Sequence, residues 1–318
     1  MLGLFPASGA LGGSIASQLV GTCNVPAKSL TFIARHPAKL DKYKDQGVTV
    51  RQADYDAHET LVHAFDGVDT LCLISYASIQ NDHRFESHKR AIDAARASGV
   101  KHILYTSLAF AGPPESTTSV TQVMQAHLRT EAYLREVAAK DPAFTYTVVR
   151  EGLYTESFGL YTAFFSLSSP TSPIRIPHDG SAPGVAWAKL EDLGEATARV
   201  LVATSSSGKY KNELLLLTGE RVLSLSETVS LLGTAAGLPS LHIERVSPEE
   251  YAKQPALEAG FASYGGRDKW ALPWSTAWEG IRRGETAHVT QTLREVLGRE
   301  PEPAEVTLRE MGRQARGE

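Results

Sequence analysis

The sequence predicts an α/β fold, a doubly wound parallel sheet with a smaller C-terminal α/β lobe. A glycine turn at Pro6–Gly13 joins an apolar run over 1–5 to an amphipathic helical pattern, as the first strand and helix of such a sheet would be joined. Strand-like and helix-like segments then alternate through the first half of the chain. The run Thr70–Tyr76 is apolar on both faces, which a buried parallel strand requires.

The elements that follow the turn imply right-handed βαβ crossovers and therefore a parallel sheet. In chain order they are expected at Ser29–Arg35 (strand), Lys39–Asp45 (helix), Val48–Asp54 (strand), His58–Phe65 (helix), Thr70–Tyr76 (strand), Asp82–Ser98 (helix), His102–Leu108 (strand), Val120–Ala139 (helix) and Tyr146–Arg150 (strand). Ligands of such sheets bind at the carboxyl ends of the strands. The residues that this rule gathers around one crevice are Pro6–Gly12, Arg35, Asp54, Ser75, Tyr76, Ser107 and Glu151–Tyr154.

The second half is less regular, and we expect a nucleotide-binding domain over 1–153 and a smaller substrate-side lobe over 154–318. The stretch Ser166–Pro183 is rich in Ser and Pro and is expected to be a loop. The segment 185–218 is expected to return to the sheet. The other expected elements are a helix at Leu190–Ala203, a buried strand at Glu213–Thr218, a capping box at Ser224–Glu227, a helix start at Ser247–Glu250, and an amphipathic helix from Val289 to Leu297 with a polar tail.

The composition is that of an ordinary globular protein and excludes several classes of function. Of the 318 residues, 42% are hydrophobic and 21% are charged, and the formal net charge is −4. A pI near 6.2 indicates no basic surface for direct binding of nucleic acid or of an anionic membrane. Cys23 and Cys72 are too few for a disulfide framework, and no metal site is expected from them or from the ten histidines. Without a signal-peptide pattern or a long apolar run, a cytoplasmic protein is expected.

The glycine turn is the strongest candidate binding motif. A strand that enters a helix through such a turn directs free backbone N–H groups and the positive end of the helix dipole outward, as a pyrophosphate site requires. Gly12 suits close packing of helix on strand, and Gly9 suits a backbone that approaches a phosphate. The spacing is that of Gly-x-x-Gly-x-x-Gly, with Pro6 at the first position. An ordinary tight turn is the alternative.

The residue after the second strand indicates which dinucleotide is bound. Sites for NAD usually place Asp or Glu there to hold the ribose hydroxyls. This strand ends in Ala34-Arg35-His36, without a carboxylate. Arg35 can form a bidentate contact with a 2′-phosphate, which favours NADP(H) over NAD(H). A solvated surface arginine is the alternative.

The usual proton donor of short-chain dehydrogenases is absent from the sequence. In Tyr-x-x-x-Lys, the lysine lowers the tyrosine pKa so that the tyrosine can protonate an alkoxide. None of the eleven tyrosines has lysine four residues later. Reduction of a simple ketone is therefore disfavoured, whereas hydride addition to a quinone yields a resonance-stabilised anion that water can protonate. Positioning and electrostatics would then provide the catalysis.

Two groups of residues remain as catalytic candidates. His127, Thr130 and Glu131 share one face of a predicted helix, and His127 could contact nicotinamide or substrate. Tyr154 follows the sixth strand and could stack on a planar substrate. The structural alternatives are a histidine that bonds the backbone at a helix end and a core tyrosine with a satisfied hydroxyl.

These motifs together resemble the NmrA-like atypical short-chain dehydrogenases/reductases, in particular the group of NADPH-dependent quinone oxidoreductases of type 2 and triphenylmethane reductases. The resemblance covers most of the chain. It rests on Pro6–Gly13, Ala34–Lys39, Gly47–Tyr55, Gly67–Asp69 with Leu73–Ser75, Ala94–Leu108, His127 with Thr130 and Glu131, and Tyr146–Thr147 with Arg150, Tyr154 and Glu156.

The resemblance implies an NADPH-binding Rossmann domain, a small C-terminal lobe, and a small planar organic acceptor between them. The residues that it assigns to the cofactor are Ser8, Gly9, Ala10, Leu11 and Gly12 for the pyrophosphate, Arg35 for the 2′-phosphate, Asp54 and Tyr55 at the adenine, and Ser75, Tyr76 and Ser107 toward the nicotinamide. Two departures from the group's pattern are Pro6 in place of the first glycine and Glu151 in place of an asparagine.

The function that follows is an NADPH-dependent reductase of a quinone or similar conjugated acceptor, with His127, Tyr154 and Glu151 as catalytic candidates. The resemblance also leaves an alternative, because the same family contains proteins that bind the dinucleotide without using it. In that case the chain would be an NADP(H)-sensing regulator that binds a protein partner. Whether it forms a homodimer is left open.

Overall fold

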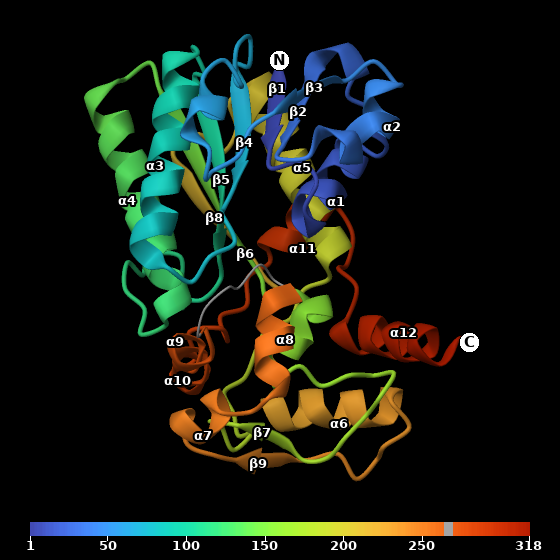
Figure 1. Cartoon of the computed structure of the whole chain (residues 1–318). Coiled ribbons are helices and arrows are strands. Elements are labelled where there is room, and N and C mark those ends of the chain that lie inside the picture. Colours follow the sequence, from blue (N-terminus) through green and yellow to red (C-terminus); the bar gives the residue numbers. More distant parts are fainter. Residues whose placement is uncertain (264–269) are drawn as a thin grey trace.

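Seven parallel strands form the central sheet of the protein (Figure 1). The structure is a computed structural model and describes residues 1–263 and 270–318. The strand order is β3-β2-β1-β4-β5-β6-β8, which confirms the predicted doubly wound arrangement. The strands are β1 (Leu2–Phe5), β2 (Leu30–Ala34), β3 (Thr49–Gln52), β4 (Thr70–Ile74), β5 (His102–Leu108), β6 (Thr145–Glu151) and β8 (Glu213–Leu217).

Helices cover both faces of the sheet because each central strand is apolar on both sides. On one face, α1 (Ala10–Val20) packs on α5 (Leu190–Ser207), and α11 (Thr292–Leu297) packs on α5 and β8. On the other face, α3 (Asn81–Ala97) packs on α4 (Gln122–Lys140). The short η2 (Pro37–Leu40), α2 (Asp41–Lys44) and η3 (His58–Leu61) connect the strands at the β3 end of the sheet. The two faces bury separate apolar clusters, one around Ile15 and Leu104 and the other around Phe65 and Ile103.

A second lobe lies beyond the carboxyl ends of the strands (Figure 1). Its core is rich in buried aromatic side chains, among them Trp187, Tyr251 and Trp278. Its elements are η4 (Thr155–Tyr161), β7 (Ile174–Ile176), α6 (Leu225–Ala235), β9 (Ile243–Arg245), α7 (Pro248–Ala252), α8 (Ala256–Ser263), α9 (Ala271–Trp274), α10 (Thr276–Arg282) and α12 (Ala304–Arg316). Within the described residues, no helix is long and apolar enough to cross a membrane.

Several predicted elements need correction. Only His58–Leu61 of the helix expected over His58–Phe65 is helical, as one short 3₁₀ turn, because the backbone becomes extended at Val62 (ψ 127°) and His63 takes a positive φ of 63°. The expected loop Ser166–Pro183 contains β7, which pairs in parallel with β9. The expected polar tail forms α12, which packs on α6. The predicted capping box at Ser224 is confirmed, and so is the predicted helix start at Ser247, which also forms a capping box with Glu250.

Candidate active site at the strand ends

The turn between β1 and α1 leaves the start of α1 open. Gly9 is the N-cap residue, no side chain caps the helix, and its first turn has no acidic residue. A Cβ on Gly9 would have no atom within 4 Å, whereas a Cβ on Gly12 would lie 2.2 Å from the carbonyl oxygen of Pro6. Gly9 and Ala10 are exposed, and Ser8 is half-buried. The backbone N–H groups and dipole of α1 are therefore available to an anion, which is the arrangement that a pyrophosphate needs.

The other turn residues have structural roles. Leu11 is buried in the apolar cluster beneath α1, and Pro6 is half-buried at the end of β1. The contact between Gly12 and Pro6 brings the helix onto the strand so closely that no side chain fits between them. Of the residues predicted to hold the pyrophosphate, Ser8, Gly9 and Ala10 are thus on the accessible side, and Leu11 and Gly12 could contribute only backbone atoms.

Arg35 is exposed directly after β2 and has no hydrogen bond or ion pair within the described chain. Its charge acts on the carboxylate of Asp56. The hydroxyl of Tyr76 donates to this carboxylate at 2.8 Å, and His83 Nε2 lies 2.9 Å from it. The hydrogen bonds from Tyr76 and His83, together with the charge of Arg35, outweigh partial burial and lower the pKa of Asp56. A phosphate could therefore reach Arg35 without displacing a salt bridge.

The two residues predicted at the adenine, Asp54 and Tyr55, differ in how far they are exposed to solvent. Asp54 is half-buried, and its carboxylate accepts the backbone N–H of Asp56, so it holds the turn after β3. Tyr55 is buried, donates to the carbonyl of Ile74, and packs between Phe5 and Tyr76 with ring centroids at 4.7 and 5.3 Å. Tyr55 thus lies beneath Tyr76, and only Tyr76 of the pair is accessible there.

A buried polar network joins α3 and α4 to the ends of β4 and β5. Arg84 donates to Ser75 Oγ at 2.7 Å from Nη2 and 3.1 Å from Nε, and Nη2 also lies 2.7 Å from His127 Nε2. His127 Nδ1 lies 3.0 Å from the hydroxyl of Tyr105. Burial beside Arg84 holds the pKa of His127 well below its usual value. Both nitrogens of the neutral ring are therefore engaged within the protein.

His88 extends this network toward Tyr76. Its Nε2 accepts the backbone N–H of Tyr76 at 2.8 Å, and its Nδ1 lies 2.9 Å from Thr130 Oγ1. Burial, with the charge of Arg84, lowers the pKa of His88 strongly, so this ring is also neutral. His88 therefore fixes the backbone of the segment that follows β4.

Glu131, one of the predicted helix-face residues, binds Arg150 inside the protein. Both side chains have 0% exposure, and Glu131 accepts from Arg150 at 3.0 and 2.8 Å and from Ser107 Oγ at 2.7 Å. Arg150 also donates to the carbonyl of Ser116 at 2.7 Å. This pair ties α4 and β6 to the loop after β5, so Ser107 and Glu131 have structural partners already.

Glu151 ends β6 on the opposite face of the sheet from Arg150, facing α5. It is 1% exposed, one oxygen accepts from Thr197 Oγ1 at 2.6 Å, and the other oxygen has no partner within the described residues. Burial raises the pKa of Glu151 to about 8. The carboxyl group is therefore protonated at neutral pH and can donate a hydrogen bond.

Tyr154, three residues after β6, is half-buried against the α1–α5 cluster. Burial, with Glu151 and Glu156 nearby, raises its pKa further above the usual tyrosine value. A hydroxyl with a raised pKa is a weak acid, so this site offers a ring to stack on and a poor proton donor.

Sequence reasoning missed Arg84, His88 and Asp56. Arg84 and His88 lie on one face of α3 at i and i+4, and that spacing in a polar segment was the available signal. Asp56 carries no motif of its own, and its link to Tyr76 depends on how two loops meet.

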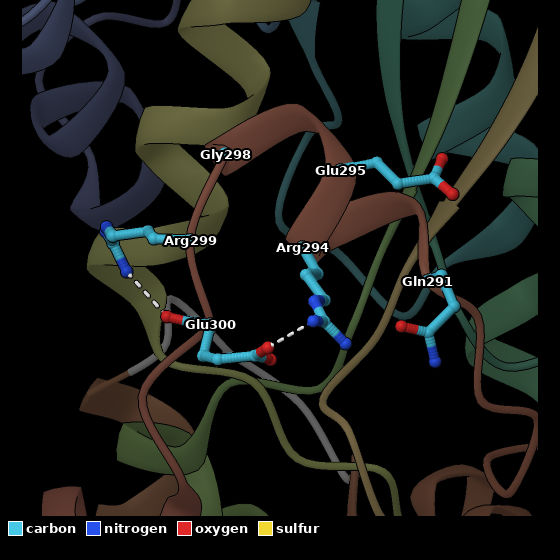
Figure 2. Close-up of a pocket in the computed structure, with 6 residues that line it drawn as sticks. All are labelled: Gln291, Arg294, Glu295, Gly298, Arg299 and Glu300. Atoms are coloured by element: carbon cyan, nitrogen blue, oxygen red, sulfur yellow. Dashed lines mark hydrogen bonds and ion pairs between the residues drawn. The ribbon is translucent and has the colours of Figure 1, made fainter.

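A hollow of about 620 Å³ lies elsewhere, beside α11 (Figure 2). Figure 2 shows Arg294 paired with Glu300, at 2.7 Å, and Arg299 donating to the backbone carbonyl of Glu300. Its lining includes no residue of the glycine turn or the strand ends, so it is distinct from the candidate site. The residues that line it are Gln291, Arg294, Glu295, Gly298, Arg299 and Glu300.

Comparison with known proteins gives full-length matches. Among curated proteins, an NmrA-like family domain-containing oxidoreductase of Aspergillus flavus is 29% identical over 96% of this chain and 92% of its own length. Quinone oxidoreductase 2 of Escherichia coli is 31% identical over 94% of each. The curated relatives are thus oxidoreductases.

Solved structures agree in fold over the whole chain. The Escherichia coli NADPH-dependent quinone oxidoreductase complexed with NADPH has a TM-score of 0.78, with 28% identity over 98% of this chain and 99% of that one. The Citrobacter triphenylmethane reductase complexed with NADP(H) has a TM-score of 0.73, with 28% identity over 99% of both chains. The NmrA-like family model matches residues 2–260. This match spans most of the sequence, and the chain belongs to the NmrA-like family.

Proposed function

We propose that this protein is an NADPH-dependent reductase that transfers hydride to a quinone or a similar planar conjugated acceptor. The observation that carries the proposal is the open, uncapped start of α1 beside an unpaired arginine at the end of β2. The relatives that are named as NADPH-dependent or are complexed with NADP(H) support the same cofactor.

The residues at the strand ends fit such a dinucleotide. Backbone N–H groups of Ser8–Gly12 would hold the pyrophosphate, and Arg35 would hold the 2′-phosphate by a bidentate contact. Tyr76, which the family resemblance placed toward the nicotinamide, would instead border the adenine half, since it covers Tyr55 beside β1 and carries an accessible ring. Bound NADPH would supply the hydride for the reaction.

The remaining side chains orient the acceptor rather than protonate it. Tyr154 offers a ring whose hydroxyl is a poor acid, and His127 is neutral and fully hydrogen-bonded. An acceptor whose reduced form is a stabilised anion needs no strong acid, because water can protonate it. We therefore propose direct hydride transfer without an indispensable side-chain proton donor.

Oxidation of NADPH by the intact protein, measured as loss of reduced-nicotinamide absorbance against a panel of quinones and enones, tests the proposal. Turnover with at least one planar conjugated acceptor is expected. NADPH binding without oxidation by any acceptor would reject it and would favour an NADP(H)-sensing regulator with a protein partner.

A further inference from the structure

Two arginines are buried near the carboxyl ends of the strands, and only one of them has a counter-ion. Arg150 is bound by both oxygens of Glu131. Arg84 is 6% exposed, and all its partners are neutral: Ser75 Oγ, His127 Nε2 and, at 3.1 Å, the carbonyl oxygen of Val123. Within the described residues, Arg84 has no carboxylate at ion-pair distance.

A guanidinium keeps its charge in proteins, so Arg84 cannot lose a proton to become neutral in its buried position. Its five N–H groups include one on Nε and two on Nη2, which the contacts to Ser75 and His127 use. Nη1 has two, and the carbonyl of Val123 accepts one of them. One N–H of Nη1 is left for a ligand. A buried cation without an anion is strongly unfavourable, so an anionic group that arrives at this point would be strongly bound.

Arg84 lies where an acceptor would meet the nicotinamide end of the crevice. Ser75, which accepts from both Nη2 and Nε of Arg84, follows β4 directly. Tyr105 of β5 and Tyr154 beyond β6 are both near enough to act on the charge of Arg84. Its contacts with Ser75 after β4, with the carbonyl of Val123 at the start of α4, and with His127, which lies 3.0 Å from the hydroxyl of Tyr105, place the guanidinium between the end of β4, β5 and the start of α4.

The phosphates of the cofactor have other partners, namely the start of α1 and Arg35. These groups lie at β1 and β2, on the other side of β4 from β5 and β6. The anion that remains for Arg84 is therefore one that the acceptor carries or develops.

We propose that Arg84 is the residue that selects acceptors by charge, because its free N–H binds the acceptor oxygen that becomes negative during reduction. This inference rests on the proposed reductase function. It names the substrate class as neutral conjugated carbonyl compounds, quinones or enones, and it disfavours acceptors that are cations.

The step balances without another reagent. A hydride from the dihydronicotinamide adds to a conjugated carbon of the acceptor and forms a C–H bond, which leaves the nicotinamide oxidised. The π electrons of the acceptor move onto its carbonyl oxygen as the C=O bond becomes single. The resulting enolate oxygen accepts the Arg84 hydrogen bond and then takes a proton from water. The enol formed from an enone tautomerises to the saturated ketone, and the enol formed from a quinone becomes the hydroquinone when its sp3 ring carbon loses a proton to water. Reduction of a cationic triarylmethane dye differs, because the added hydride neutralises the cation and no oxyanion forms.

The test compares Arg84→Met, Arg84→Lys and a control, Arg90→Met, which removes an exposed cation from the same helix. Each variant is assayed with a neutral quinone, a neutral enone and a cationic triarylmethane dye. We expect Arg84→Met to lower kcat for the quinone and enone by about a hundredfold or more, as loss of an oxyanion donor does. Dye reduction should stay unchanged or rise. Arg84→Lys should restore part of the loss, and Arg90→Met should match the unchanged protein.

An equal fall in quinone and dye reduction in Arg84→Met, with NADPH affinity retained, would overturn the inference, since it would indicate a structural role only. If the unchanged protein reduces no acceptor, the proposed function fails, and a binding experiment still decides the inference. Calorimetry of para-nitrophenolate, a planar stable anion, with the NADP⁺-saturated protein should show binding that Arg84→Met abolishes and Arg90→Met retains. Equal binding of para-nitrophenolate by Arg84→Met and Arg90→Met would contradict the proposed role of Arg84.

Discussion

Nη2 of Arg84 lies 2.7 Å from Nε2 of His127, and this contact determines which chemistry the histidine can perform. Arginine can only donate, so Nε2 of His127 accepts and its proton is on Nδ1, which faces the hydroxyl of Tyr105. The adjacent cation and burial keep the ring neutral, with a pKa well below the usual histidine value. His127 is therefore a poor general acid at neutral pH, and its role is to position Arg84.

His127→Ala should accordingly reduce turnover or raise KM without eliminating activity. The change leaves one Arg84 N–H without a partner and removes the shorter contact of the Tyr105 hydroxyl, which keeps the contact with His88 Nδ1 at 3.4 Å; the loss costs about 1–3 kcal/mol of stability. Steady-state kinetics and denaturant unfolding measure both effects. Complete loss of activity in a folded variant that binds NADPH would contradict the positioning role.

Arg35→Ala should lower the preference for NADPH over NADH about ten- to hundredfold. A charge-assisted contact with the 2′-phosphate contributes about 1.5–3 kcal/mol, and Arg35 has no internal partner that would weaken it. Calorimetry with both cofactors measures the ratio. Lys39→Ala, in the exposed 3₁₀ turn that follows, serves as the control. Equal affinity of the unchanged protein for NADPH and NADH would contradict the assignment.

Gly12→Ala should abolish or strongly weaken NADPH binding, and Gly12→Val should do so completely, while the fold largely survives. A Cβ at Gly12 would lie 2.2 Å from a backbone oxygen, so the turn that presents the N–H groups must shift. Gly13→Ala is the matched control, because a Cβ at Gly13 would have no atom within 4 Å. The substitution also replaces a helical glycine by a better helix former. The control should bind NADPH normally and gain about 0.5–1 kcal/mol of stability. Unchanged affinity in Gly12→Val would show that phosphate binds elsewhere.

Tyr154→Phe should cost little activity, because the ring remains to stack and the hydroxyl is a poor acid. Tyr154→Ala should cost more, about 1–3 kcal/mol of acceptor binding. Steady-state kinetics of the two variants with one acceptor separates the ring from the hydroxyl. An inactive Tyr154→Phe that still binds NADPH would identify the tyrosine as a true proton donor.

Glu151→Gln should remove a pH-dependent loss of stability. The folded pKa of Glu151 is raised to about 8, so the folded state binds a proton that the unfolded state releases near its usual value of 4.5. The free energy of unfolding therefore falls as the pH rises from 4.5 to about 8, by up to about 5 kcal/mol in all. Unfolding measured from acid to alkaline pH should give a flatter profile for Glu151→Gln. Glu213→Gln, at the exposed start of β8, should retain the slope; identical slopes in all three proteins would contradict the assignment.

The parts of the fold that depend on local pattern could be predicted from the sequence. The strand His102–Leu108 has the predicted bounds, and the glycine turn lies between β1 and α1 as expected. The β7–β9 pair could not be predicted, because Ile174 and Ile243 are far apart in the chain and each strand has three residues. Arg84 could not be identified as a site residue for the same reason, because its contact with His127 forms only when α3 packs on α4.

Direct hydride transfer from NADPH to a conjugated acceptor is the central step of the proposed reaction. The most direct test is a reaction of the intact protein with NADPH that carries deuterium at both C4 positions of the dihydronicotinamide and a neutral enone, followed by mass analysis of the product. We expect stoichiometric NADPH loss and deuterium bound to carbon in the reduced enone, with a solvent-derived proton at the second position. Tight NADPH binding with no loss of reduced cofactor across the whole acceptor panel, or a product without deuterium at carbon, would contradict the account.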